Sequence, residues 1–134
     1  MGTEVDVDGV PLFTLTGVSL AGREGRLRLR DVTVEIPDRA VTVVVGASGS
    51  GTSSLLRLCN RLEAPDSGVV CFRGRNLTET DPRRHRRRVG LLFQQPVTFP
   101  GTGRDNLREA APDADDDRLT GWLEAADLDR SFLD

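Results

Sequence analysis

The chain has 134 residues and a formal net charge of −3 at pH 7. This length corresponds to one domain that buries about two thirds of its unfolded surface, and the acidic balance argues against nucleic acid as a partner. No apolar stretch approaches the roughly 18 residues of a membrane span, and no secretory signal opens the chain. We therefore expect a cytoplasmic protein that reaches a membrane only through a partner.

The N-terminal part of the chain predicts β-structure. Residues 12–20 and 26–36 place apolar side chains at alternate positions, and the residues from Ala21 to Gly25 separate them. This pattern is typical of two strands joined by a turn, each with one buried face. Residues 40–45 then read AVTVVV, a β-branched run that favours a buried parallel strand.

A glycine-rich loop follows this run. It reads Gly46, Ala47, Ser48, Gly49, Ser50, Gly51, Thr52, Ser53 and Ser54, close to the pattern G-x-x-x-x-G-K-[ST], whose backbone N–H groups surround a phosphate. Residues 53–62 predict a helix, and helix N-termini favour anions. A flexible connection would explain the loop's composition but not its flanks. We therefore predict that these residues bind nucleotide phosphates and that Ser53 is a magnesium ligand.

The loop departs from the pattern at one position, because Thr52 stands where a lysine is expected. The chain contains no lysine, since all 18 of its basic residues are arginine. A charge-assisted contact of this kind contributes about 1.5–3 kcal/mol to binding, and positioned charge on a transferring phosphoryl group changes the rate by roughly 100-fold or more. We expect weak nucleotide binding and no turnover, and we assign no catalytic residue.

The middle of the chain predicts one more strand and a short basic helix. Residues 69–74 favour the strand, and Thr80 or Asp81 can cap a helix that has Pro82 at its first position. That helix carries the run RRHRRR at residues 83–88. A solvated helix face explains the run better than a nucleic-acid or membrane patch, because no aromatic residue interrupts it. His85 is predicted to be a solvated surface residue.

Two cysteines and the C-terminal segments complete the pattern. Cys59 and Cys71 have no metal-ligand spacing, so both are predicted to be small buried side chains. Residues 89–93 favour a buried strand, residues 94–103 a loop with two prolines, and residues 104–111 and 115–128 two helices. Trp122, on the second helix, is predicted to be buried in the core. The acidic residues at the start of this helix are favoured there by the helix dipole.

Several stretches together resemble the nucleotide-binding subunit of an ATP-binding cassette (ABC) transporter. These are LRDVTVEIP before the loop, APDSGVVCFRGRNL after its helix, RRRVGLLFQQPVTFPGTGRDNL, and LEAADLDRSFLD. The resemblance implies an α/β fold: a P-loop NTPase with a RecA-like core and an N-terminal antiparallel β subdomain, incomplete at the C-terminus. It further implies that residues 1–134 are a partial nucleotide-binding domain, with the β subdomain and P-loop core to about residue 100 and the start of the helical subdomain over about 101–134.

The resemblance also implies a ligand and partners. The ligand is ATP with Mg²⁺, and Gln94 would contact both the nucleotide site and the metal. Residues from Gln95 to Gly103 would receive a membrane-spanning transporter subunit, and a second ATP-binding subunit would pair with this one. These partners would hold the protein at the inner face of the cell membrane. The amino-acid sequence FQQPVTFPGTGRDNL looks most like that of subunits that serve phosphate or metal-ion transporters.

Other departures from the family pattern argue against ATP hydrolysis by this chain. The aromatic residue that stacks on adenine in the family is replaced near Ala21 and Gly22, and the chain stops where the signature segment would begin. The signature, the acidic strand and the switch histidine are then expected to be missing. Two further interpretations therefore stay open, a catalytically inactive regulatory module for a transporter complex and a non-functional gene fragment. The transported substrate and the direction of transport are left open.

Overall fold

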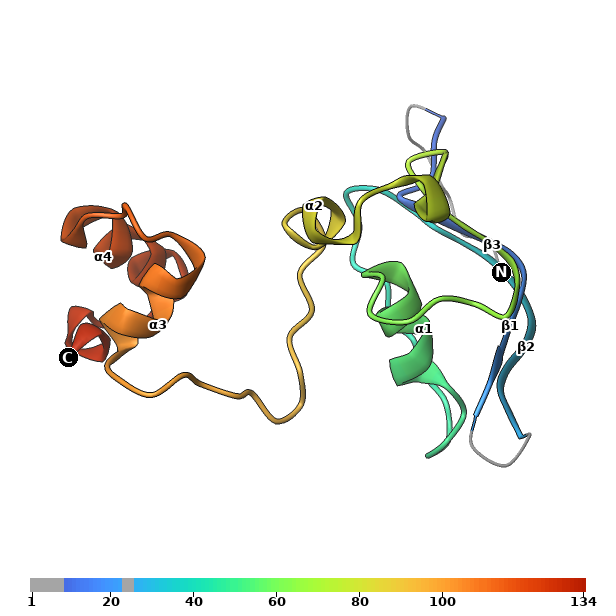
Figure 1. Cartoon of the computed structure of the whole chain (residues 1–134), viewed down its shortest axis with the longest axis horizontal. Helices are drawn as coiled ribbons and strands as arrows, with labels where there is room; N and C mark the ends of the chain where they lie inside the picture. The colour runs from blue at the N-terminus through green and yellow to red at the C-terminus, as the bar shows by residue number, and fades with distance from the viewer. Residues whose placement is uncertain (1–8, 23–25) are drawn as a thin grey trace. The chain divides into compact units, whose positions relative to one another are not determined.

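A computed structural model describes residues 9–22 and 26–134 (Figure 1). The chain divides into two compact units, one that ends at Leu91 and one from Leu92 to Asp134. Among the described residues, no helix is long and apolar enough to cross a membrane. The two units are taken in turn below, because each has its own core.

The first unit is built on an antiparallel sheet of four strands, in the order β2-β1-β3-β4. The predicted hairpin and the third strand are confirmed, while Arg23–Gly25 of the predicted turn lie outside the described residues. Because β1 pairs with both β2 and β3, it is an interior strand of the sheet, and its alternating pattern buries one of its faces. The strands are β1 (Phe13–Ala21), β2 (Leu27–Ile36), β3 (Ser67–Phe72) and β4 (Arg75–Asn76).

Helix α1 (Thr52–Cys59) covers one face of this sheet (Figure 1). Leu15 and Val18 from β1 meet Leu58 from α1 in the core, all three almost fully buried. The predicted helix is confirmed but ends earlier than residue 62. Its end follows from Arg61, which adopts a left-handed φ of 58° and so cannot continue a right-handed helix.

Two predicted strands are wrong. Residues 40–45 and 89–93 form no strand, and Val41 is 94% exposed while Leu92 is 89% exposed. The physical reason is a lack of pairing partners, because every strand pair in the described part of the chain is antiparallel and none involves these runs. Isolated strands leave their backbone groups unpaired, so β-branched composition alone does not produce one.

Helix α2 (Pro82–Arg86) begins where predicted, because the Asp81 carboxylate accepts a hydrogen bond of 2.8 Å from the Arg84 backbone N–H. A short 3-10 helix, η2 (Leu77–Glu79), precedes it. The arginines of the run are exposed, as predicted. The prediction for His85 is wrong, since this side chain is only 2% exposed.

The burial of His85 has a local cause. Its place in the helical turn directs it to the sheet, where its ring lies edge-on to Phe72 at 5.2 Å between centroids. Its Nε2 lies 2.8 Å from the Cys59 carbonyl oxygen. A carbonyl can only accept, so Nε2 donates and the buried ring is satisfied. Cys59 is buried as predicted, whereas Cys71 is only half-buried.

The second unit contains the two predicted helices, the second of which ends before residue 128, and a terminal 3-10 turn that was not predicted. They are α3 (Gly103–Ala110), α4 (Asp116–Ala125) and the 3-10 helix η3 (Arg130–Leu133). Leu119, Leu123 and Leu133 form its core with Ala114. The prediction of a core position for Trp122 is wrong, because the side chain is 38% exposed and the Arg118 guanidinium lies 5.1 Å from its ring centroid.

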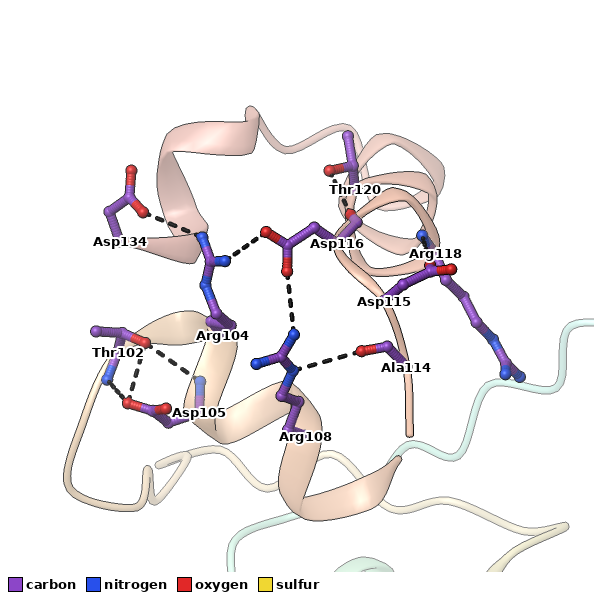
Figure 2. Close-up of polar contacts among 10 residues, drawn as sticks. All are labelled: Thr102, Arg104, Asp105, Arg108, Ala114, Asp115, Asp116, Arg118, Thr120 and Asp134. Carbon is purple, nitrogen blue, oxygen red and sulfur yellow. Dashed lines mark hydrogen bonds and ion pairs between the residues drawn. The ribbon is translucent and has the colours of Figure 1, made fainter. Parts of the chain in front are cut away.

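Charged side chains connect the elements of this unit, as Figure 2 shows. Asp116 at the start of α4 pairs with Arg104, and with Arg108 at 3.1 Å, both from α3. Arg104 also reaches Asp134 at 3.3 Å. The predicted role of the acidic run as a helix start is confirmed, since Asp115 caps α4 and Asp116 lies in its first turn. These ion pairs join α3 to α4 and to the C-terminal residue.

Candidate functional site

The glycine loop connects the irregular run at 41–47 to the N-terminus of α1. Its tightest part is a turn in which the Ser50 backbone N–H donates to the Ala47 carbonyl at 2.9 Å. Gly51 occupies the position before the helix, and no side chain caps the first turn of α1. The N–H groups of that turn have no side-chain partner, which is the arrangement that accepts an anion.

Two glycines of this loop lie where an added Cβ would come too close to neighbouring atoms. Gly51 has a left-handed φ of 94°, and a Cβ there would collide with the Arg28 carbonyl oxygen and the Leu29 side chain of β2. A Cβ at Gly46 would collide with the Ser50 hydroxyl. Glycine is therefore required at Gly51, where the loop packs against the backbone of β2, whereas at Gly46 the neighbouring atoms belong to the Ser50 side chain.

The side chains of the loop differ in what they can reach. Residues 46–50 and Ser53 are exposed, and Thr52 is half-buried at the first position of α1. Ser54 is buried at 6% exposure, and its hydroxyl accepts a hydrogen bond of 3.2 Å from the Arg28 guanidinium. Ser53 thus offers a hydroxyl to solvent at the helix start, while that of Ser54 is used inside the fold.

The charge that Thr52 lacks is not replaced by the arginines packed near α1. The Arg28 guanidinium forms an ion pair with Glu63 at 3.0 Å, and Arg57 approaches the same carboxylate at 3.5 Å. Both cations are thereby directed toward Glu63, which follows the C-terminal end of α1. The Arg28 contact escaped sequence reasoning, because nothing in the local pattern of β2 or of the loop links the two segments.

Gln94 lies in the second unit, in an exposed and irregular segment. The loop belongs to the first unit, so a joint role for Gln94 and Ser53 stays a prediction. Among the described residues, no group of three histidine, cysteine or acidic side chains is placed to hold a metal ion.

The segment that follows Gln94 is held at its far end by α3. The Asn106 side chain accepts from the Phe99 N–H at 2.7 Å and donates to the Phe99 carbonyl at 3.0 Å. Thr102 and Asp105 cap α3 reciprocally, as Figure 2 shows. Hydrogen bonds from the backbone and hydroxyl of Thr102 hold the pKa of Asp105 below its usual range. The sequence signal for this anchor is the T-x-x-D spacing.

A glycine loop that leads into a helix N-terminus beside an antiparallel sheet defines a P-loop NTPase of the ABC type. A family model described as ABC transporter matches residues 29–133. The chain therefore belongs to the ABC transporter family, in the group of ATP-binding proteins.

Two relatives and one solved structure illustrate the similarity. ABC transporter I family member 17 of Arabidopsis thaliana is 42% identical over 126 residues, which cover 91% of this chain and 48% of that protein. Phosphate import ATP-binding protein PstB 1 of Synechococcus sp. is 41% identical over 88 residues, 60% of this chain and 32% of that protein. A bacterial Atm1-family ABC exporter with ATP bound shares the fold, with a TM-score of 0.79, 23% identity, and coverage of 90% of this chain and 21% of the exporter. The chain spans less than half the length of each.

Proposed function

We propose that this chain is the nucleotide-binding part of an ABC transporter ATP-binding subunit, and that residues 46–54 bind the phosphates of ATP. The observation that carries the proposal is the uncapped N-terminus of α1 behind a loop bounded by Gly46 and Gly51. Backbone N–H groups and the helix dipole attract phosphate without any side-chain charge. Binding through the backbone is therefore retained although Thr52 replaces the lysine.

Magnesium is the second part of the proposal. The exposed hydroxyl of Ser53 at the start of α1 is one protein ligand, and Gln94 is the other. Mg²⁺ accepts a few protein oxygens together with phosphate oxygens and waters, so these neutral groups fit it. When bound, the ion neutralises charge on the ATP phosphates.

The proposed partners follow from the segment after Gln94. Residues 95–103 receive a membrane-spanning subunit, and the exposed Val97 and Phe99 in this segment supply apolar contact area. A second ATP-binding subunit completes the pair, and the assembly lies at the cytoplasmic face of the membrane. In the proposed domain division, the β subdomain and P-loop core extend to about residue 100, and the helical subdomain begins over about 101–134. The name of the Synechococcus relative supports phosphate as one candidate for the transported substrate, beside metal ions.

A second candidate function rests on Thr52. Without the lysine charge, the loop binds ATP weakly and does not stabilise phosphoryl transfer. The chain then acts as a nucleotide-sensing, catalytically inactive module that regulates a transporter complex. The two functions share the loop and differ in turnover.

The decisive experiment restores the lysine. Calorimetry of the 134-residue chain with Mg-ATP should show binding about 10- to 100-fold tighter in Thr52→Lys, the effect of one charge-assisted phosphate contact. Thr52→Gln is the matched control, since it lengthens the side chain without adding charge and should leave the affinity unchanged. An equal gain in both variants would show that the charge is not the cause.

Two further measurements separate the candidates. Ser48→Glu places a carboxylate on the exposed loop and should abolish ATP binding, whereas unchanged binding there would move the nucleotide site elsewhere. The chain as it stands should release no phosphate from ATP above background. Turnover that disappears in Ser53→Ala would assign hydrolysis to this loop and exclude the inactive module.

A further inference from the structure

A second concave site lies in the first unit, away from the glycine loop. It is a pocket of about 400 Å³ between the β3–β4 turn and α2. Four arginines line it: Arg73 after β3, Arg75 on β4, Arg84 in α2 and Arg88 after it. No residue of the loop is among its lining residues. The pocket is thus separate from the nucleotide site proposed above.

The charge of this pocket is positive although the chain is acidic. Glu79 and Asp81 are its two carboxylates, against four guanidinium groups, in a chain of net charge −3. Asp81 uses one carboxylate oxygen to cap α2, and Arg73 pairs with Asp38 at 2.9 Å outside the pocket. Within residues 9–22 and 26–134, no carboxylate forms an ion pair with the other three arginines. The excess of positive charge is therefore available to a ligand.

The wall of the pocket is held in place before any ligand arrives. The Arg88 guanidinium lies 5.0 Å and that of Arg73 5.8 Å from the centroid of the Phe72 ring, a cation–π arrangement that restricts both side chains. The ring in turn meets the buried His85, which is tied to the Cys59 carbonyl. Arg73 and Arg88 are thus partly ordered before a ligand binds, which lowers the conformational entropy that these two side chains lose on binding.

We propose that this pocket binds the phosphate group of a small soluble molecule. Guanidinium groups match phosphate oxygens in pairs, which makes arginine the side chain suited to a clustered phosphate site. The volume accommodates a phosphomonoester, and the arginines surround a concavity instead of forming a flat basic face. A free phosphate compound therefore fits better than the headgroup of a lipid in a bilayer.

The test is a titration of the full chain with glycerol 3-phosphate, followed by calorimetry and by the backbone amide shifts of α2. The pocket variant Arg75→Gln/Arg84→Gln should bind about 100-fold more weakly, because it removes two charge-assisted contacts and each weakens binding by about tenfold. The matched control Arg83→Gln/Arg87→Gln removes the same charge from exposed arginines that do not line the pocket, and should bind within about twofold of the unmodified chain. Arg84→Lys keeps the charge and should show an intermediate loss.

Several outcomes would overturn the proposal. Equal weakening in the pocket variant and its control would show attraction by diffuse charge alone. Loss only in Ser48→Glu would assign the phosphate to the glycine loop, a result that leaves the proposed ATP site intact. Binding to vesicles that contain phosphatidic acid, without binding of glycerol 3-phosphate, would assign the pocket to a membrane surface. Circular dichroism of each variant, whose changed side chains are all exposed, confirms that the fold is retained.

Discussion

Both units of this chain contain ion pairs, but they differ in the size of the apolar core that stabilises each. In the first, Leu15, Val18 and Leu58 lie between the sheet and α1 and are almost fully shielded from water. In the second, a smaller core of Ala114 and three leucines is supplemented by ion pairs from Arg104 and Arg108 to Asp116. Burial of apolar area scarcely depends on salt, whereas partly exposed ion pairs are screened by it.

This contrast teaches that the units should respond to different perturbations. The sequence supplies a separate probe for each, because Trp122 is the only tryptophan and lies in the second unit, while both cysteines lie in the first. Fluorescence then reports on the second unit and thiol accessibility on the first. The following four changes are ordered from the largest expected effect to the smallest.

Truncation of Leu15 to alanine should unfold the first unit. The side chain is 0% exposed on the central strand, and a buried leucine-to-alanine change typically costs about 2–5 kcal/mol. Urea unfolding followed by reaction of Cys59 measures the loss. Thr16→Ala, at an exposed position of the same strand, should cost less than about 1 kcal/mol. If the Trp122 transition shifts with that of Cys59 in Leu15→Ala, the units are not independent.

Alkaline pH should weaken the first unit through Cys59. Burial raises the pKa of this thiol from 9.0 to about 11, so the folded state holds a proton that the unfolded state releases. The stability from this group is complete below pH 9 and falls as pH rises through 11, by up to about 3 kcal/mol at about 1.4 kcal/mol per pKa unit. The chain has no tyrosine or lysine to titrate in this range. Unfolding measured against pH should lose this slope in Cys59→Ala, and an unchanged slope would contradict the assignment.

Removal of the Asp116 charge should weaken only the second unit. Asp116→Asn loses both arginine pairs, which are about one-third exposed on the carboxylate side, so we expect a loss of about 1 kcal/mol. Urea unfolding by Trp122 fluorescence measures it. Molar salt should produce most of this loss in the unmodified chain and little in the variant. Asp117→Asn, in the same turn, is the control, and a salt response equal in both variants would exclude the ion pairs as its source.

Replacement of Val43 by threonine should change stability least. The side chain is exposed outside both cores, so we expect a shift within about 0.5 kcal/mol. The exposed valines of this run should nevertheless promote association between chains. Sedimentation should therefore show less self-association in Val43→Thr than in the unmodified chain. A large loss of stability would mean that the run packs against the sheet.

The sequence predicted the elements whose signals are local. The hairpin, α1, the Asp81 cap of α2 and the start of α4 all depend on residues within a few positions of one another, and all are present. The composition of the valine run at 41–45 favours a strand just as strongly, but no strand forms there. A parallel strand requires partners distant in the chain, and no described segment pairs with this run.

The candidate site divides in the same way. The spacing of Gly46 and Gly51 predicted a phosphate loop that leads into a helix, and the structure has a tight turn at residues 47–50 followed by α1. Phosphate binding by this loop stays a prediction. The hydrogen bond from Arg28 to Ser54 joins β2 to α1 across 26 positions, so no local pattern could reveal it. His85 was misread because its neighbours are all charged, while its position on the turn of α2 decides its burial. The approach of Gln94 to the loop stays a prediction.

The hydrogen bond between His85 and the Cys59 carbonyl has a mechanical consequence. It fastens the last residue of α1 to the middle of α2, and the chain leaves the first unit only six residues after His85. Because this contact is buried, the C-terminal end of α1 and the middle of α2 cannot move apart without leaving the Cys59 carbonyl oxygen unpaired.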